Sequence, residues 1–302
     1  MGINESLVIT WAMMSVRMTT PILFAALGGL LTSRTGVFNL ALEGMMLSGA
    51  FFGYYGALTS GSPWMGLLVA LLIGILLGLL FAYFSVTLNV NQVITSIGIN
   101  TVALGLTSYF SRVLLTDSDV IVAPTFKDIV IPGLSDLPII GPIVFSHSIL
   151  VYLSILILII VNWFLFKTTN GLNLRAIGED ATACKTVGIN VALYRYLAII
   201  ACGALASIGG AYITTVAVNR FLENIVEGRG WIAFAAIIFG RNMPLGVFGA
   251  CLLFGAATAL QMLLQVQGFK IPYRFALMIP YVVTMLTIAL IAKKEQIGKV
   301  DA

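Results

Sequence analysis

The sequence has very little charge. Only 9% of its 302 residues are Asp, Glu, Lys or Arg, and 60% belong to the hydrophobic set. A soluble protein carries about 25% charged residues, and the mean hydropathy of this chain is +1.05. So few charged side chains cannot cover a surface that faces water. The composition therefore excludes a soluble globular domain and predicts an integral membrane protein.

Several kinds of functional site are also missing. The one histidine, His147, has no potential metal ligands beside it, and Cys184, Cys202 and Cys251 are too far apart for a zinc or redox motif, so we expect unpaired apolar thiols. There is no Gly-x-x-x-x-Gly-Lys-Ser/Thr stretch and no basic face with interleaved aromatic residues. We therefore expect no cofactor, no metal and no nucleic-acid partner on this chain. If ATP is used, another subunit must bind it.

Long apolar stretches are what the sequence has instead. They cover residues 7–31, 36–59, 64–88, 92–114, 148–166, 196–218, 231–240, 245–266 and 275–292. A spanning helix needs about 20 residues, and ten helical residues reach only about 15 Å, so 231–240 is too short to cross unaided. The sequence predicts an all-α membrane protein with about 8–10 transmembrane helices in one domain, 1–302. The segment 231–240 forms a short or broken helix that either crosses or re-enters.

Basic residues are unevenly distributed between the connections. The connection 167–195 and the C-terminal tail are rich in Lys and Arg, which places both in the cytoplasm. With nine crossings the N-terminus lies outside and the C-terminus inside. Nine basic residues then face the cytoplasm and six face outside. The connection 116–147, with four prolines, becomes an extracellular loop. We expect it to lack regular helix and to pack as an ordered cap, or to form a docking surface for an extracellular partner.

The connection 167–195 contains a short predicted helix. Acidic residues follow Gly178, where they complement the free N–H groups of a helix start, and Gly188 suits a helix end. The pattern predicts a two-turn helix over Asp180–Val187. Such a helix is marginal in water on its own, so it must pack against the bundle or against a cytoplasmic partner.

The fourth apolar stretch carries a polar stripe. Its members are Asn89, Gln92, Ser96, Asn100, Thr107 and Ser111, whose spacing puts them on one helical face. Such a face looks at protein or water rather than lipid, so the stripe forms interhelical hydrogen bonds or lines a pathway.

An ionisable side chain and an indole are further candidates. Glu43 lies within an apolar stretch, where a carboxylate is costly, so it is either hydrogen-bonded to loop backbone or exposed to substrate. We do not expect it to pair directly with Arg17. Trp231 and Phe38 are able to stack on a flat ring, although an indole also anchors helices at the interface. The candidate pathway residues are Asn39, Glu43, Gln92, Ser96, Asn100, Trp231 and Gln261.

Three sequence blocks carry a more specific pattern. They are Ser33-Arg34-Thr35-Gly36-Val37-Phe38-Asn39-Leu40-Ala41-Leu42-Glu43-Gly44, Gly171-x-x-x-Arg175-Ala176-x-Gly178-Glu179-Asp180-x-x-Ala183-x-x-x-x-Gly188, and Glu227-Gly228-Arg229-Gly230-Trp231 through Gly240-Arg241-Asn242-x-Pro244. Together and in this order they resemble the permeases of ABC importers of the branched-chain amino acid, ribose and simple-sugar superfamily. The similarity is greatest to the nucleoside and simple-sugar branch.

This resemblance implies a function and a set of partners. A permease of this kind pairs with an identical or related permease, two ATPase subunits that bind the ATP, and an extracellular substrate-binding protein or lipoprotein. It moves its substrate by alternating access across the cytoplasmic membrane of a bacterium. The second block would form the cytoplasmic coupling helix that contacts the ATPases, through Arg175, Gly178, Glu179, Asp180, Ala183 and Gly188.

Other functions remain open at this point. Within the same family, branched-chain amino acids are the alternative substrate. An ion-coupled secondary transporter would need several carboxylates within the membrane, and Glu43 is the only acidic residue available there. A membrane scaffold without transport activity is a third alternative. Amides and hydroxyls without further ionisable groups favour a neutral polyhydroxyl substrate.

Overall fold

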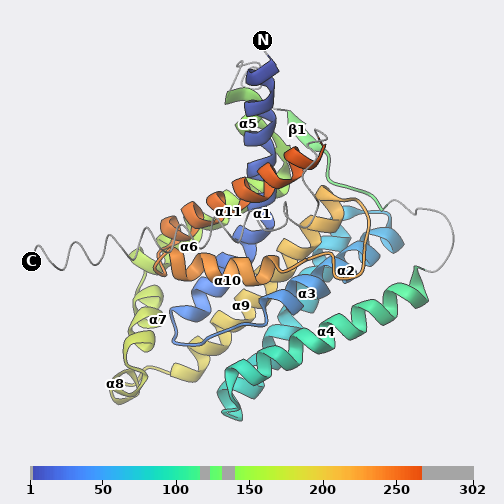
Figure 1. The fold of residues 1–302 in the computed structure, drawn as a ribbon. Coiled ribbons are helices and arrows are strands. Elements are labelled where there is room, and N and C mark those ends of the chain that lie inside the picture. The colour runs from blue at the N-terminus through green and yellow to red at the C-terminus, as the bar shows by residue number, and fades with distance from the viewer. Residues whose placement is uncertain (1–2, 116–122, 131–139, 267–302) are drawn as a thin grey trace, which may run out of the picture.

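A computed structural model describes residues 3–115, 123–130 and 140–266, which form a helical bundle (Figure 1). Within these described ranges, six helices are long and apolar enough to cross a membrane. They are α1 (Ile3–Ser33), α3 (Pro63–Ala82), α4 (Gln92–Leu114), α6 (Ile149–Lys167), α9 (Val191–Tyr212) and α11 (Pro244–Val266). The all-α membrane fold predicted from composition is confirmed. The stretch 275–292 lies outside the described residues.

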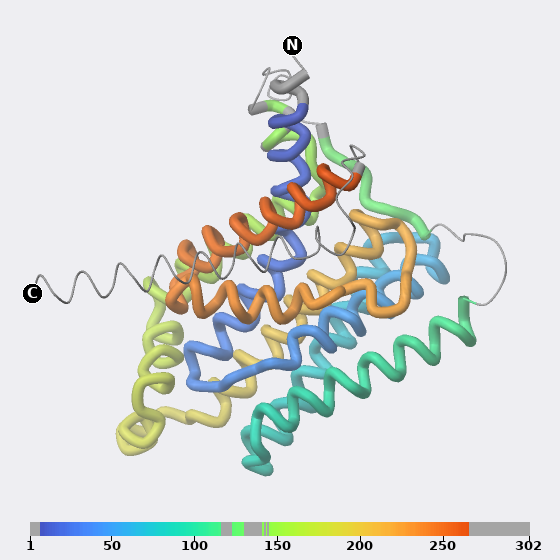
Figure 2. The backbone as a smooth tube through the Cα atoms, viewed as in Figure 1, coloured from blue at the N-terminus to red at the C-terminus, as the bar shows by residue number. Residues whose placement is uncertain are grey.

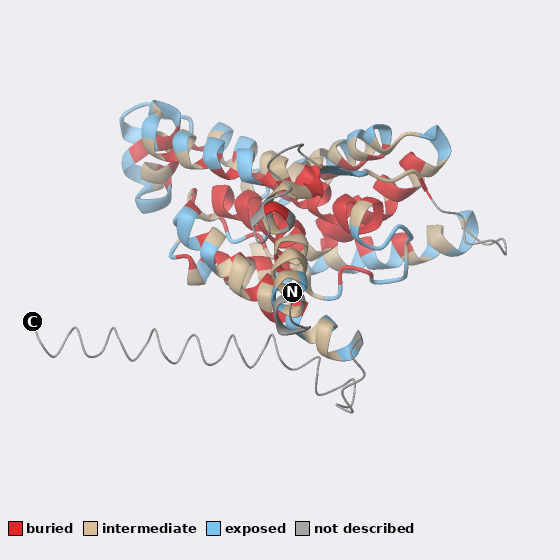
Figure 3. Cartoon of the chain, turned by 90° about the horizontal axis from the view of Figure 1, so that it is seen from above, coloured by how far each residue is buried: buried red, intermediate tan, exposed pale blue. Residues whose placement is uncertain are grey.

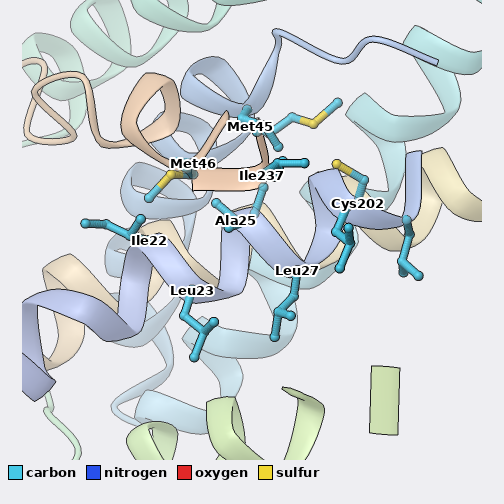
Figure 4. Packing of buried hydrophobic residues seen from close by; sticks show 14 of the residues in the cluster. Ile22, Leu23, Ala25, Leu27, Met45, Met46, Cys202 and Ile237 are labelled. Carbon is cyan, nitrogen blue, oxygen red and sulfur yellow. The ribbon is translucent and has the colours of Figure 1, made fainter. Parts of the chain in front are cut away.

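Helix α2 (Leu42–Ser60) lies at the centre of the bundle, where it packs against α3, α9 and α4. Thirteen of its 19 residues are buried, so it contacts protein rather than lipid along most of its length. Figure 4 shows Met45 and Met46 of α2 beside Leu27 of α1, Cys202 of α9 and Ile237. In Figure 3 the buried residues gather in the middle of the molecule and the exposed ones at its periphery.

Helix α9 packs closely against its neighbours because its inward face consists of small residues. A Cβ atom at Gly210 would overlap the carbonyl oxygen of Met46, and one at Gly203 would overlap that of Gly74 on α3. Both α3 and α9 continue into a short π-helical turn, η1 (Tyr83–Thr87) and η2 (Ile213–Ala217). The turns lengthen these two candidate spans to Thr87 and Ala217.

The connection between α4 and α6 contains β1 (Asp128–Val130), α5 (Ile140–Phe145) and β2 (Ser146–Ser148). The two strands pair antiparallel, with Asp128 opposite Ser148, and Arg17 of α1 forms an ion pair with Asp128. The described part of this loop is therefore ordered against the bundle. The expectation that prolines exclude helix here is wrong for α5, because Pro142 lies in its first turn, where no backbone donor is lost.

Three predicted boundaries need correction. Helix α2 begins at Leu42 rather than near residue 36, and residues 37–40 are not helical; Figure 2 shows this stretch as extended blue tube below the orange α10. Helix α9 begins at Val191 rather than residue 196. The connection between α6 and α9 contains two helices, α7 (Thr169–Glu179) and α8 (Ala181–Thr186), instead of one. The short segment near 231–240 is confirmed as α10 (Arg229–Phe239), 11 residues long.

Candidate functional site

The three sequence blocks, far apart along the chain, meet in space around residues 33–46. This segment joins α1 to α2, and we call its part between Gly36 and Ala41 the unwound segment. It contacts α4 on one side, α7 on another and the residues around α10 on a third. Each contact consists of hydrogen bonds or of close packing between backbones.

Side chains of α4 satisfy the backbone of the unwound segment. The amide of Phe38 donates to Oε1 of Gln92 (2.8 Å), and the amide of Leu40 donates to Oγ of Ser96 (3.1 Å). Asn100 makes two bonds, accepting from the Gly44 amide (2.8 Å) and donating to the Leu40 carbonyl (3.0 Å). In a membrane, backbone groups outside a helix need such partners.

Three of the six residues of the predicted polar stripe therefore hydrogen-bond to the backbone of the unwound segment. Gln92, Ser96 and Asn100 are the members that reach the unwound segment. Thr107 and Ser111 instead bond to carbonyls of α4 itself, and Asn89 precedes the helix, whose N-cap is Asn91. The stripe was predicted to hydrogen-bond between helices or to line a pathway. Asn100 bonds another helix through the Gly44 amide of α2, whereas Gln92 and Ser96 bond the non-helical unwound segment. A pathway role for the three side chains stays a prediction.

Glu43, in the first turn of α2, holds α10 in place. Its two carboxylate oxygens accept hydrogen bonds from the backbone amides of Gly228 (2.8 Å) and Gly230 (2.7 Å) at the start of α10. A carboxylate there complements the unpaired amides and positive end of a helix. The hydrogen-bonded role considered for Glu43 is thus present, although its partners lie in α10 rather than in its own loop. Arg17 pairs with Asp128 and not with Glu43.

The end of α1 is tied to the turn between α10 and α11. Ser33 Oγ donates to Oδ1 of Asn242 (2.8 Å), and Nε of Arg34 donates to the Asn242 carbonyl (2.7 Å). Asn242 has a positive φ of 54°. These bonds were not predicted, although both residues belong to the sequence blocks that carry the family resemblance.

Helix α7 packs directly on the same turn. A Cβ atom at Gly178 would overlap the carbonyl oxygen of Arg34, so only glycine permits this approach. Nε of Arg195, in α9, donates to the Thr35 carbonyl (3.3 Å). Burial, together with the positive charge of Arg175, lowers the pKa of Arg34, while Glu179 opposes that shift. Charged residues of α7 therefore lie close enough to act on the end of α1.

Helix α8 matches the predicted short helix in its caps but not in its length. The side chain of Asp180 caps it by accepting from the amides of Thr182 (2.8 Å) and Ala183 (3.0 Å), and Gly188 has the positive φ (84°) expected after a helix end. The helix covers Ala181–Thr186 rather than Asp180–Val187. Gly178 and Glu179 belong to the end of α7.

One side of α8 faces its own chain and the other is exposed. Cys184 packs with Ile177 of α7 and Val191 of α9 in a small separate core. Ala183 and Val187 are exposed, Val187 to 74%. Arg175 lies over the ring of Phe166, 4.8 Å from its centroid, which directs its guanidinium toward the junction of α6 and α7. Figure 1 shows α7 and α8 projecting from the bundle at one corner.

The remaining candidates differ in exposure. Asn39 is buried, accepts from the Ala41 amide (2.9 Å) and donates to Sγ of Cys202 (3.3 Å). Phe38 and Trp231 are exposed to 61% and 46%. Gln261 lies on α11, away from the other candidates in sequence and element. The three cysteines are unpaired and buried, as predicted, and the described residues contain no cluster of potential metal ligands.

A helical bundle with a central buried helix, a short 11-residue helix and a projecting helical pair is the architecture of a polytopic membrane protein. Residues 12–288 match the family described as branched-chain amino acid transport system / permease component, and the chain belongs to this family. It is 36% identical to the guanosine ABC transporter permease protein NupQ of Bacillus subtilis (strain 168), over 93% of this chain and 90% of that protein. It is 34% identical to the nucleoside ABC transporter permease protein NupC of Lactococcus lactis subsp. cremoris, over 94% and 92%.

More distant matches add two facts. The same two organisms each contain a second relative with a matching name, NupP (26% identical over 80% of this chain and 71% of that protein) and NupB (24% over 78% and 67%). Among solved structures, PsaBC from Streptococcus pneumoniae in complex with Fab has a similar fold. Its TM-score is 0.53 at 15% identity, covering 91% of this chain and 88% of that chain.

Proposed function

We propose that this chain is the permease subunit that carries nucleosides into a bacterial cell in an ATP-driven importer. The observation that carries the proposal is the naming of two relatives, for guanosine and for nucleosides, at 34–36% identity over more than nine-tenths of the chain. A Haloferax volcanii protein named "Putative glucose ABC transporter permease protein TsgC13" is also 34% identical, over 82% of this chain, with 75% of that protein covered. It makes a simple sugar the second candidate substrate.

In the proposed importer, the ATPase subunits act on this chain through α8. We assign α8 and its flanking residues as the cytoplasmic surface on which partner ATPases act, with ATP bound only by those partners. Its exposed side supports this role, as does its rigid link through Gly178 to the end of α1. Asp180 and Gly188 fix the helix ends, while Ala183 is exposed on α8. Arg175 and Glu179 contribute charge near Arg34.

A second permease and a substrate-binding protein complete the assembly. Two organisms contain a pair of relatives, one at 34–36% identity to this chain and one at 24–26%. This pairing supports a heterodimer in which the second permease is a chain of the more distant kind. The extracellular binding protein or lipoprotein docks at the opposite end from α8, where β1 and β2 lie (Figure 1).

The side chains available to a nucleobase are aromatic. Asn39, Glu43 and Ser96 already hydrogen-bond within the chain. Phe38 and Trp231 are both exposed, the first in the unwound segment and the second in the first turn of α10. Planar rings stack on a nucleobase with little dependence on its identity. Gln92 uses its Oε1 within the chain, which leaves its NH₂ group for a ribose hydroxyl. Both polar atoms of Asn100 are engaged by Gly44 and Leu40, and Gln261 lies apart on α11, so a pathway role for these two requires rearrangement.

Uptake in a bacterium without its own nucleoside importers tests the function. Radiolabelled guanosine is supplied to cells that express this chain with an ATPase, a second permease and a binding protein of this importer class from the same organism. We expect uptake that stops when the ATPase carries an inactivating P-loop lysine substitution. Unlabelled nucleosides should compete, and glucose or leucine should not. Competition by glucose or leucine alone would reject the nucleoside assignment, and uptake without a functional ATPase would reject the ATP-driven mechanism.

The aromatic contacts have a separate test. Trp231→Ala and Phe38→Ala should each lower the apparent affinity for guanosine in the same assay, because each removes a stacking surface. Trp163→Ala is the matched control, since Trp163 is also an exposed aromatic residue, at 59%, but lies on α6. Equal effects of all three substitutions would contradict the assignment.

A further inference from the structure

A cavity that the proposed transport function does not use lies where α1, α5, β2, α6 and α11 pack together. Its volume is about 200 Å³, and eleven residues line it. Seven of them are apolar side chains from the four helices, and the other four are Thr19, Thr20, His147 and Ser154. An apolar wall with a few polar groups is the usual composition of a site for a small molecule.

His147, which lines this cavity from β2, has a ring nitrogen without a partner. The residue is fully buried, and its Nε2 lies 2.8 Å from the carbonyl oxygen of Ile143. A carbonyl oxygen only accepts hydrogen bonds, so Nε2 carries the ring proton. Burial lowers the pKa of His147, which keeps the ring neutral at neutral pH and leaves a lone pair on Nδ1. Nδ1 is buried and has no hydrogen-bond partner among the described residues.

The other polar side chains that line the cavity also offer only acceptors. The hydroxyls of Thr19, Thr20 and Ser154 each donate to a carbonyl three or four residues earlier in their own helix (2.7, 3.0 and 2.7 Å). A hydroxyl has one proton, so each of these oxygens keeps only its acceptor capacity. No acidic side chain lines the cavity, so a cation would lack a counter-charge there. A ligand that matches this lining is neutral and donates a hydrogen bond.

The volume of the cavity favours an organic molecule over water. A water molecule occupies about 30 Å³ in the liquid and needs two to four polar partners. One water could pair with Nδ1 of His147, but the apolar wall offers no partners to the several others that would fit. A dry apolar cavity of about 150 Å³ binds benzene. A molecule slightly larger than benzene that carries one hydroxyl fills this cavity and also supplies the missing donor.

We infer that this cavity is a binding site for a small, neutral, membrane-soluble phenol or alcohol, whose hydroxyl donates to Nδ1 of His147. The apolar body of the ligand contacts α1, α6 and α11. The inference does not depend on the nucleoside assignment, because none of the candidate pathway residues lines the cavity. A bound molecule joins β2, in the connection between α4 and α6, to three candidate spans. Because it binds only the folded chain, it raises the stability of that chain.

The single histidine of the chain makes this hydrogen bond directly observable. The full chain is labelled with nitrogen-15 only at histidine, purified through a tag without histidine, and placed in nanodiscs of phosphatidylcholine, a lipid without a hydroxyl donor. We expect the Nδ1 resonance of His147 to move upfield when phenol is added. Toluene, which has nearly the same shape but no hydroxyl, should leave it in place. A hydrogen-bonded Nδ1 before any addition, equal shifts with both compounds, or no shift with phenol would overturn the inference.

Filling the cavity tests where the phenol binds. Ile155→Trp and Val151→Phe each enlarge a side chain of the α6 wall, and both should abolish the phenol-dependent shift of His147. Ile159→Trp is the matched control, because Ile159 also lies on α6, is exposed to 60% and does not line the cavity. It should respond to phenol like the parent. A full response in both blocking variants, with thermal stability like that of the parent, would show that phenol binds elsewhere.

The contribution of the hydrogen bond to affinity has its own measurement. Both compounds are titrated against the melting temperature of the parent and of His147→Leu, which removes the acceptor and keeps an apolar side chain. We expect the preference for phenol over toluene to be about fivefold greater in the parent, the effect of one neutral hydrogen bond. The same preference in both chains would contradict the role of Nδ1. The nitrogen-15 shifts decide the case even if His147→Leu fails to fold.

Discussion

At the scale of single residues, Glu43 connects two elements that are distant in sequence. Removing its carboxylate leaves the amides of the half-buried Gly228 and the buried Gly230 without these partners. We expect Glu43→Ala to lower thermal stability and uptake strongly, because each unsatisfied buried donor costs about 1–3 kcal/mol. Glu43→Gln should have a smaller effect, because it keeps an acceptor. Thermal unfolding of each purified variant in detergent measures the change in stability, and the guanosine uptake assay measures the change in transport.

The control for Glu43 is a nearby acid without such bonds. Glu227 is largely exposed and its carboxylate lies 3.9 Å from Arg229. Glu227→Gln should leave the melting temperature within error of the parent. If Glu43→Ala also melts like the parent, the two bonds to α10 contribute nothing to stability.

His147 makes stability depend on pH. It is fully buried, its Nε2 lies 2.8 Å from the Ile143 carbonyl, and it lines a cavity of about 200 Å³. Burial lowers its pKa, and among the charges that face it, Arg17 lowers the pKa further while Asp128 raises it.

The direction of the effect follows from linkage. In the unfolded chain His147 binds a proton near pH 6.5, whereas the folded state resists protonation. The contribution of the neutral His147 to stability is therefore fully present above that pH and is lost as the pH falls below it. The melting temperature should fall as the pH is lowered from 7.5 to 5.5, because the free energy of unfolding decreases by up to about 1.4 kcal/mol per pH unit. His147→Gln, in a chain with one histidine, should show a weaker pH dependence. An identical pH profile would contradict this origin.

At the scale of elements, the contact between α7 and the end of α1 is the rigid link in the proposed coupling. Gly178→Ala places a methyl group against the Arg34 carbonyl and pushes α7 away. We expect uptake per ATP hydrolysed to fall about tenfold, the effect of 1.4 kcal/mol, with the ATPases still bound. Leu172→Ala, at an exposed position of the same helix, should transport normally. Full activity of Gly178→Ala would show that this contact transmits nothing.

The accuracy of sequence-based prediction also differed between elements. The bounds of α4 were predicted correctly at 92–114, because an Asn cap, an apolar run and a regular polar stripe agree there. The unwound segment was missed, since Val37, Phe38 and Leu40 are apolar like a span. Its backbone is held by side chains more than 50 residues away, a non-local effect that composition cannot show.

Helix α7 was missed for a different reason. Its sequence is polar and contains Gly171 and Asn173, both weak helix formers. Tertiary contacts compensate, because Tyr194 of α9 bonds with Asn170 and Asn173. The candidate site could be found only in part from the residues themselves. The stripe and Glu43 were found by their polarity, whereas the partners of Glu43 are backbone amides, which leave no trace in a sequence.

At the scale of the whole molecule, the proposed orientation predicts which surfaces are reachable from each side. Lys127 lies near β1 and Val187 lies at the end of α8, and both residues are exposed, so each can be replaced by cysteine as a labelling site. A membrane-impermeant maleimide should label Lys127→Cys in intact cells and Val187→Cys only after permeabilisation. The native thiols are buried, which keeps the background low. The reverse pattern would invert the assigned topology.

The bonds between α4 and the unwound segment also define a unit of exchange between related permeases. Three amides and one carbonyl of residues 38–44 depend on the side chains of Gln92, Ser96 and Asn100. A chimera that replaces α4 alone would leave those groups unpaired within the membrane. Transplanting residues 36–44 and 92–100 together should preserve folding, because these two distant stretches form a single structural module.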